Sequence, residues 1–272
     1  MILDYSEYLI EEDTQSFCLN QKLFYYNYSF CPFCRCSTSQ VDHKDLSHEK
    51  GWAGFDSFEE KFSVYQCDSC GWWEVKHYKE SYNYYGDPEP EMINSADIKR
   101  AILRSYDPKD IALPISVLRN ALISKKDYIY KIHPQKMEEL VQSVFSDFYD
   151  CKVEHCGGSG DGGIDLFLLN SDKPTMIQVK RRTKPNSVEA VSEIREFLGA
   201  VVLGQGQKCI FVTTAKKFSN PAIKSASKAV ENKTVEQFDL YNFDKFMSIL
   251  NLVRNQPTET WKMLRPDWYD SI

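Results

Sequence analysis

Two short apolar segments, joined by a polar turn and carrying polar residues at strand spacing, constrain this 272-residue chain most. They lie in residues 157–180, GGSGDGGIDLFLLNSDKPTMIQVK. Side chains alternate between the faces of a strand, so Gln178 and Lys180 share one face. A hairpin turn centred at 171–172 brings Asp165 opposite Gln178. An acid, an amide and an ammonium then converge on one surface of an apolar sheet.

Such polar groups cost several kcal/mol to bury unless they are paired or bind a metal. A cation held by the Asp165 carboxylate and the Gln178 oxygen, with Lys180 beside it, accounts for them. The alternative is a surface hairpin whose polar residues lie on its wet face. Apolar residues on both faces of each strand favour a buried sheet instead.

The segment resembles the core of the PD-(D/E)XK nuclease superfamily, specifically its Mrr-like restriction endonuclease branch. That branch has a glycine-rich loop before the first acid and a Q-x-K element in place of D/E-x-K, and GGSGDGGIDL and IQVKR are similar to both. Residues 137–140, MEEL, resemble the family's helix motif, usually Phe-Glu-x-Leu, with Met137 in place of Phe. CIFVTTAKKFSNPA resembles the strand and helix that follow the active site. The likeness covers residues 131 to about 252.

The resemblance implies a metal-dependent DNA endonuclease that hydrolyses phosphodiester bonds. Asp165 is expected to anchor Mg²⁺ or Mn²⁺, Gln178 to add a neutral oxygen, and Glu138 to supply a further carboxylate directly or through water. Lys180 is expected to position the attacking water, a safer role than general base because its ordinary pKa is about 10.4. Asp161 is either an extra ligand or a turn residue of the glycine loop, and His155 is expected to be structural.

Charge is distributed unevenly along a chain whose net charge is −6. Residues 1–92 hold 7 Lys+Arg against 17 Asp+Glu, whereas residues 131–254 hold 17 against 15. Because phosphate binding needs local positive charge, the run Arg181, Arg182 and Lys184 is expected to contact nucleic-acid phosphates. A solvated basic loop is the alternative. The acidic N-terminal third is expected to dock a partner protein or a second copy of the chain.

Two C-x-x-C pairs, Cys31/Cys34 and Cys67/Cys70, predict the two knuckles of a zinc ribbon with a structural zinc. Gly71 suits the left-handed turn of a knuckle. The pairs are farther apart than in a compact site, which predicts an insertion containing His43 and His48, and Cys36 is a spare. A disulfide is disfavoured by the expected cytoplasmic location. A catalytic zinc is disfavoured because four thiolates leave no open position.

The pattern of apolar residues predicts an α/β protein, with a mixed sheet flanked by helices and a small β-rich zinc-ribbon module. The predicted parts are a zinc-ribbon module (1–92), a helical connector (93–130), a nuclease domain (131–255) and a C-terminal tail (256–272). Helices are predicted at 95–105, 114–123, from Pro134, at 187–203, from Asn220 and at 243–254. Strands are predicted at 24–30, 62–65, 72–78, 152–155, 208–214 and 235–240, with a linker at 78–95.

No apolar run approaches the roughly 18 residues that span a membrane, and the N-terminus lacks the basic region of a signal peptide. A cytoplasmic protein that does not bind membranes is expected. Three functions stay open: a restriction or anti-phage defence endonuclease, a catalytically silent nuclease fold that binds nucleic acid or protein, and a DNA-processing nuclease such as a junction resolvase. The target sequence, its modification, the choice of DNA over RNA and the oligomeric state stay open too.

Overall fold

The computed structural model describes residues 1–13, 30–50, 56–83, 91–156, 163–170, 172–253 and 259–271. The chain divides into two compact units. The α/β unit comprises Met1–Ile2 and Tyr106–Gln256, and the β unit comprises Leu3–Ser105 and Pro257–Ile272. The division at residue 106 falls inside the predicted connector 93–130, and the predicted tail 256–272 belongs almost entirely to the β unit.

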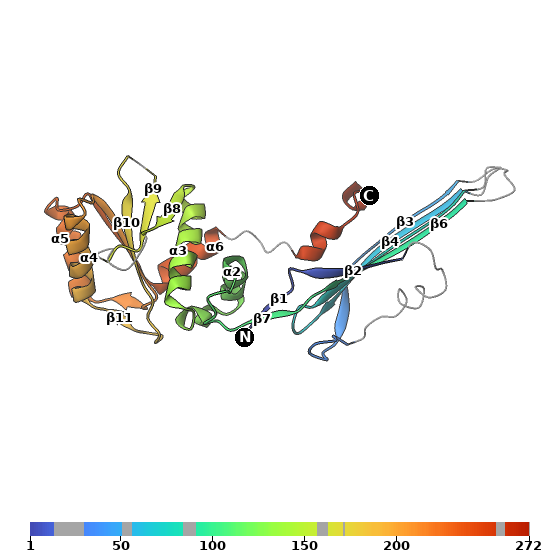
Figure 1. The fold of residues 1–272 in the computed structure, drawn as a ribbon, viewed down its shortest axis with the longest axis horizontal. Helices are drawn as coiled ribbons and strands as arrows, with labels where there is room; N and C mark the ends of the chain where they lie inside the picture. The colour runs from blue at the N-terminus through green and yellow to red at the C-terminus, as the bar shows by residue number, and fades with distance from the viewer. Residues whose placement is uncertain are drawn as a thin grey trace. The chain divides into compact units, whose positions relative to one another are not determined.

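A five-stranded mixed sheet forms the centre of the α/β unit (Figure 1). Its strand order is β14-β12-β10-β9-β8. β10 runs parallel to β12 and β12 parallel to β14, whereas β8, β9 and β10 are joined by antiparallel pairing. The strands are β8 (Lys152–His155), β9 (Leu166–Leu169), β10 (Thr175–Lys180), β12 (Lys208–Thr213) and β14 (Gln237–Tyr241).

Helices cover both faces of this sheet, which confirms the predicted restriction-endonuclease-like α/β class (Figure 1). α3 and α6 pack on one face, and α4 and α5 pack on the other. The helical elements are α2 (Ile115–Ser124), the 3₁₀ turn η1 (Lys126–Tyr130), α3 (Pro134–Tyr149), α4 (Val191–Leu203), α5 (Asn220–Glu231) and α6 (Phe243–Leu252). Two short parallel strands, β11 (Val188–Glu189) and β13 (Lys217–Phe218), lie in the loops before α4 and α5.

The sequence of α3 explains where it begins and which side it buries. Pro134 occupies its first turn, where the missing N–H costs no hydrogen bond, and the His133 side chain accepts a bond from the Gln135 N–H. The apolar side chains at helical spacing are buried at Met137, Leu140, Val141, Val144 and Phe145, whereas Phe148, which continues the same stripe, is exposed. The helix ends at Asp150, which adopts a left-handed conformation with φ of 48°.

The alternation of side chains along β10 fixes the face on which its polar residues lie. Ile177 and Val179 belong to the core formed with α3 and α6, whereas Met176 belongs to the core formed with α4 and α5. Since successive side chains point to opposite faces, Gln178 and Lys180 lie on the α4 face. All residues of β10 except Lys180 are buried, so the hairpin is not a surface hairpin with a wet face.

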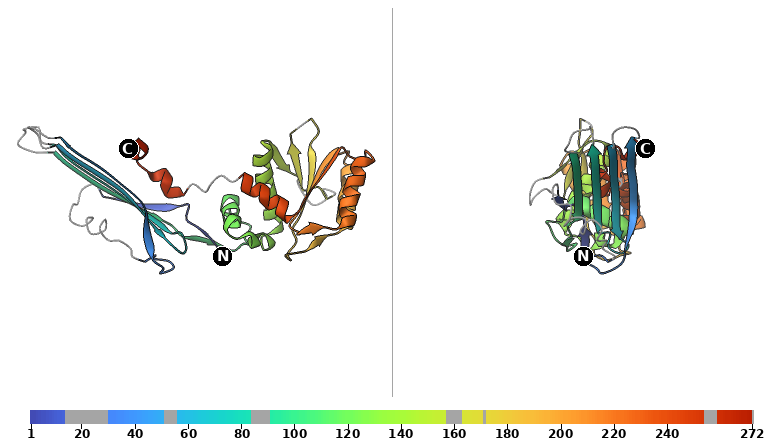
Figure 2. Two further views of the ribbon diagram at one scale, coloured as in Figure 1. Left: turned by 180° about the vertical axis from the view of Figure 1, so that it is seen from behind. Right: turned by 90° about the vertical axis from the view of Figure 1, so that its right-hand side faces the viewer.

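A long antiparallel sheet forms most of the β unit (Figure 2). Its order is β2-β6-β5-β4-β3, from the strands β2 (Tyr8–Asp13), β3 (Thr38–Lys50), β4 (Asp56–Cys67), β5 (Trp73–Asn83) and β6 (Glu91–Ala101). β3 and β4 occupy most of the interval between the two C-x-x-C pairs, so the predicted insertion is a pair of long strands. Elsewhere, β1 (Ile2–Asp4) pairs with β7 (Arg104–Tyr106).

The C-terminal segment completes the core of the β unit. It contains the 3₁₀ turns η2 (Thr260–Leu264) and η3 (Tyr269–Ser271), and it buries Trp261 and Tyr269 with Phe62 and Trp72. Arg265 Nη2 lies 2.6 Å from Asp42 Oδ2, and the Tyr269 hydroxyl also donates to Asp42. These bonds attach residues that are distant in the sequence to strand β3.

Several predicted elements differ from the structure. The predicted helix 95–105 is wrong, because most of these residues form β6, which pairs with β5 from Glu91 to Arg100. The predicted linker 78–95 is also wrong, because β5 extends to Asn83 and β6 begins at Glu91. The helix predicted at 187–203 starts only at Val191, because 188–189 pair with β13. The strand predicted at 24–30 lies almost wholly outside the described residues.

Within the part of the chain that the structure describes, no helix is both long and apolar enough to cross a membrane.

Candidate active site and cysteine cluster

The β9–β10 hairpin has the register that the sequence predicts. Thr175 pairs with Leu168, Met176 with Phe167 and Ile177 with Leu166. Continuing this register by one residue sets Asp165 opposite Gln178. The Asp165 N–H donates to the Ile177 carbonyl at 2.9 Å, which holds the two strands together at this point.

A backbone hydrogen bond holds the carboxylate of this pair, and the glycine loop lies close to its amide. The Val179 N–H donates to Asp165 Oδ2 at 2.6 Å. The Gln178 side chain is buried, and a Cβ at Gly163 would lie 3.3 Å from its Nε2 atom. Gly163 has φ of +90°, a conformation that side chains disfavour, so this end of the glycine loop suits glycine on two grounds. Asp161 lies outside the described residues.

Lys180 stands at the end of β10 and faces the first turn of α4. Its Nζ lies 3.5 Å from Glu193 Oε2, and both side chains are partly exposed. Desolvation alone raises the pKa of Glu193, but the bond from Arg182 and the charges of Lys180 and Arg182 outweigh it and hold that pKa below its ordinary value. Glu193 is a residue of this site that sequence reasoning missed, although its position at the start of a predicted helix was a usable signal.

A buried carboxylate, that of Glu189, is linked to the Lys180–Glu193 pair through Arg182. Glu189 is fully buried and forms a two-point ion pair with Arg182, whose Nε donates to Oε2 at 3.1 Å. The Thr213 hydroxyl donates to the same carboxylate oxygen at 2.6 Å. Arg182 Nη2 also lies 3.2 Å from Glu193 Oε1. The hydrogen bond to Glu189 raises the pKa of Arg182, so this guanidinium stays charged.

Glu138, the predicted further carboxylate, lies on α3 and therefore on the other face of the sheet. Its Oε2 is 3.8 Å from His155 Nδ1 on the edge strand β8. The next residue, Cys156, donates its N–H to the Asp165 carbonyl at 2.9 Å. Glu138 is thus next to His155, whose neighbour in the sequence bonds the backbone of Asp165.

In the basic run after β10, two side chains bond to other residues of the protein and one is exposed. Arg181 Nη1 donates to the Tyr130 carbonyl at 3.1 Å, and Arg182 is held by Glu189 and Glu193. Lys184 is exposed. Of the three residues predicted to contact phosphates, Lys184 is the one whose side chain extends into solvent.

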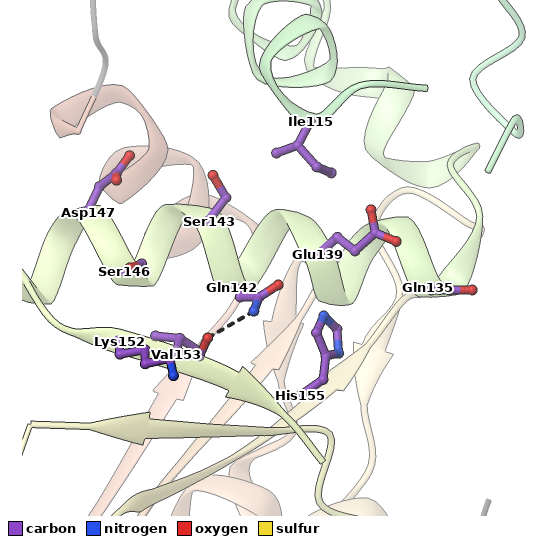
Figure 3. A pocket seen from close by; sticks show the side chains of 10 residues that line it. All are labelled: Ile115, Gln135, Glu139, Gln142, Ser143, Ser146, Asp147, Lys152, Val153 and His155. Carbon is purple, nitrogen blue, oxygen red and sulfur yellow. Dashed lines mark hydrogen bonds between the residues drawn. The ribbon is translucent and has the colours of Figure 1, made fainter. Parts of the chain in front are cut away.

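A polar groove of about 620 Å³ lies along α3 (Figure 3). Figure 3 shows His155 and Gln142 between α3 and β8, with the Gln142 amide donating to the Val153 carbonyl at 2.8 Å. The groove adjoins the Glu138–His155 pair but lies against α3, whereas Lys180 faces α4. It is therefore a separate feature from the Asp165–Lys180 site.

The two C-x-x-C pairs of the β unit meet at one point. The sulfurs of Cys31, Cys34, Cys67 and Cys70 all lie within 4.8 Å of one another. Cys31 Sγ is 3.6 Å from Cys70 Sγ, and Cys34 Sγ is 3.4 Å from Cys67 Sγ. Sulfurs at about 2.3 Å from a tetrahedral ion are about 3.8 Å apart, so the four thiols fit a metal ion. Cys36 is the spare thiol expected from the sequence, and its sulfur contacts the Cys34 carbonyl.

The two halves of the cluster repeat one backbone pattern. Cys31 N–H bonds the Cys36 carbonyl at 2.8 Å, and Cys67 N–H bonds the Trp72 carbonyl at 2.7 Å. The Arg35 and Gly71 N–H groups bond back to Cys31 and Cys67 respectively, and both residues have positive φ, of 63° and 82°. The predicted glycine requirement holds for the second knuckle, while Arg35 adopts the same conformation in the first.

Two thiols of this cluster differ in acidity. Burial raises the pKa of Cys70 to about 12, whereas a backbone N–H lowers the pKa of Cys34 to about 6. A metal cation bound by the four sulfurs would stabilise their thiolate forms.

The α/β unit thus has a mixed sheet between two helical layers, with an acid, an amide and a lysine on one hairpin. Residues 129–247 match the family model Mrr_cat, described as a restriction endonuclease. This part of the chain is a restriction endonuclease domain of that family, consistent with an Mrr-like PD-(D/E)XK nuclease. Among curated proteins, the comparison finds no match to the chain.

Proposed function

We propose that the protein is a DNA endonuclease that hydrolyses phosphodiester bonds with a divalent metal ion, Mg²⁺ or Mn²⁺, in restriction or anti-phage defence. The observation that carries the proposal is the hairpin register, which continues to put Asp165 opposite Gln178, with Lys180 two residues further along the same strand face. The family match of residues 129–247 supports the nuclease class.

Asp165 and Gln178 are the proposed metal ligands, with Glu138 as a further carboxylate. Carboxylate and amide oxygens are the donors that Mg²⁺ prefers. A bound ion would supply charge neutralisation at the scissile phosphate and would make water more acidic. The bond from the Val179 N–H restricts rotation of the Asp165 side chain, so its carboxylate is held in place before substrate binds.

Lys180 is the proposed residue that orients water and offsets phosphate charge. It stands at the exposed end of a strand that is otherwise buried, so its ammonium can meet a substrate while its backbone stays fixed. Lys184 is the proposed phosphate contact beside it, with Arg181 contributing if its bond to the Tyr130 carbonyl is exchanged for phosphate.

The cysteine cluster is proposed to hold a structural zinc ion. Zinc is the metal that four cysteines in two C-x-x-C pairs most often bind, and four thiolates leave no position for a substrate. The ion would stabilise the β unit, which is proposed to contact a partner protein or a second copy of the chain. We propose a cytoplasmic location, in which thiols stay reduced.

The test is incubation of purified protein with methylated and unmethylated supercoiled plasmid, with Mg²⁺, with Mn²⁺ and with a chelator. Nicked or linear product with metal and none with chelator is expected. DNA binding without cleavage in every metal condition would favour a catalytically silent binding module. Cleavage confined to branched substrates, tested in parallel as synthetic four-way junctions, would favour a resolvase.

A further inference from the structure

A chain of polar contacts runs from the buried sheet to the proposed catalytic lysine. It begins at Thr213 in β12, whose hydroxyl is 2.6 Å from Glu189. Glu189 holds Arg182, and Arg182 Nη2 reaches Glu193 at 3.2 Å. Glu193 in turn lies 3.5 Å from Lys180 Nζ. The contacts alternate in charge and connect the loop before α4, the start of α4 and the end of β10.

The buried part of this series of contacts, formed by Thr213, Glu189 and Arg182, is rigid for a physical reason. Glu189 and Thr213 are both fully buried, and a buried carboxylate is tolerated when it is paired and hydrogen-bonded. Arg182 is held additionally by its backbone, because its N–H donates to the Thr214 hydroxyl at 2.6 Å and its carbonyl accepts from that hydroxyl at 3.0 Å. The guanidinium therefore presents Nη2 to Glu193 in a defined place.

The other end of this series, the Lys180–Glu193 pair, is partly exposed to solvent. Lys180 and Glu193 are 32% and 26% exposed, so their attraction is screened and contributes little to stability. A glutamate held by a rigid arginine, however, restricts where the flexible lysine places its ammonium. This arrangement resembles the outer contacts that orient catalytic groups, whose loss costs activity rather than fold.

We infer that Glu193 is a positioning residue that orients Lys180 for phosphodiester cleavage. This inference rests on the proposed nuclease function of the same site. Glu193 acts through Lys180 and need not touch the substrate. Arg182 then serves as the support of Glu193, which is a different role from the phosphate contact expected from the sequence.

The experiment compares Glu193→Gln with the matched control Glu196→Gln, which changes an exposed glutamate on the same helix. Single-turnover cleavage of plasmid with Mg²⁺ should slow about 10- to 100-fold in Glu193→Gln, the usual effect of misplacing a catalytic group. The Kd for a DNA duplex in Ca²⁺ should change less than about twofold, and thermal melting should stay at the parental value. Glu193→Asp should recover part of the rate, and Glu196→Gln should cleave like the parent.

Coupling to Lys180 is tested in the double variant. If Glu193 acts through Lys180, adding Glu193→Gln to Lys180→Ala should cause no further loss of rate. Parental or faster cleavage by Glu193→Gln, or an undiminished further loss in the double variant, would overturn the inference.

Lysine acetylation mapped by mass spectrometry gives a reading that does not depend on cleavage. Lys180 should be labelled faster in Glu193→Gln than in the parent, with the labelling of other lysines unchanged. Unchanged labelling of Lys180 would overturn the inference even if the parent cleaves DNA. A parent that never cleaves would instead contradict the proposed function, while the labelling result still decides whether Glu193 restrains Lys180.

Discussion

Arg182 and Glu189 form a two-point ion pair in which the carboxylate is fully buried and the guanidinium is about one-third exposed. The pair joins the residue two positions after Lys180 to the residue four positions before Glu193. This ion pair explains why Arg182, although part of a basic run, points inward. Arg181 and Arg182 are therefore structural residues of this loop, whereas Lys184 is solvated.

Replacing Arg182 by alanine should destabilise the α/β unit. The change leaves the buried Glu189 carboxylate without its charged partner, which costs about 1 to 3 kcal/mol. Urea unfolding followed by far-UV circular dichroism measures this loss, because the α-helices of the described residues, α2 to α6, lie in the α/β unit. Lys184→Ala is the control and should unfold like the parent; an Arg182→Ala variant as stable as the parent would show that the pair is unimportant.

Lys184→Ala should weaken DNA binding without changing stability. Loss of one phosphate contact lowers the slope of log K against log salt by nearly one unit. Duplex affinity measured by fluorescence anisotropy at several salt concentrations gives the slope, with Lys233→Ala, an exposed lysine after α5, as the control. An unchanged slope for Lys184→Ala would place the main binding surface elsewhere.

The β unit should contain one tightly bound zinc ion per chain. Elemental analysis of the purified protein should give about one equivalent, and Cys67→Ser with Cys70→Ser should remove it and unfold the unit, since such ions contribute on the order of 10 kcal/mol. Cys36→Ser should retain the metal because its sulfur lies outside the cluster. Full zinc content in the double variant would contradict the assignment.

The attachment of the C-terminal segment should weaken in acid. Desolvation raises the pKa of Asp42, but the bonds from Tyr269 and Arg265 outweigh it and leave that pKa below its ordinary value. The ionised carboxylate therefore stabilises the fold above the unfolded pKa of about 3.9, and this contribution is lost as pH falls through the folded pKa.

Asp42→Asn should remove on the order of 1 kcal/mol at pH 7 and much less at pH 3. All five tryptophans belong to the β unit, so tryptophan fluorescence follows its unfolding selectively. Asp267→Asn, an exposed change in the same segment, is the control. An equal loss at both pH values would mean that the Asp42 charge is not what holds the segment.

The hairpin could be predicted because its information is local. The polar turn, the alternation around Val179 and the apolar residues on both faces fix the register within a few residues, and the observed pairs agree with it. The cysteine knuckles could be predicted for the same reason, because each C-x-x-C pair lies within one tight backbone turn. In both cases the residues that determine the geometry are neighbours in the sequence.

Features that depend on distant pairing could not be read in this way. Ile98 and Ala101 are spaced like one face of a helix, yet both are buried in β6, because pairing with β5 and β2 overrides the local pattern. Glu189 falls in a segment predicted to be helical, but residues 188–189 pair with β13 and turn its carboxylate toward Arg182. The contact of Glu193 with Lys180 arises only when α4 packs on the face of β10 that carries the lysine.

The most direct test of the proposed site is plasmid cleavage by Asp165→Asn and Lys180→Ala beside the parent, at equal concentration with Mg²⁺. The account predicts metal-dependent cleavage by the parent and a loss of at least about 100-fold in each variant, because the ligand that anchors the metal or the group that orients water is missing. Thermal melting close to the parental value would show that both variants remain folded. Cleavage at the parental rate by either folded variant would contradict the assignment of the active site.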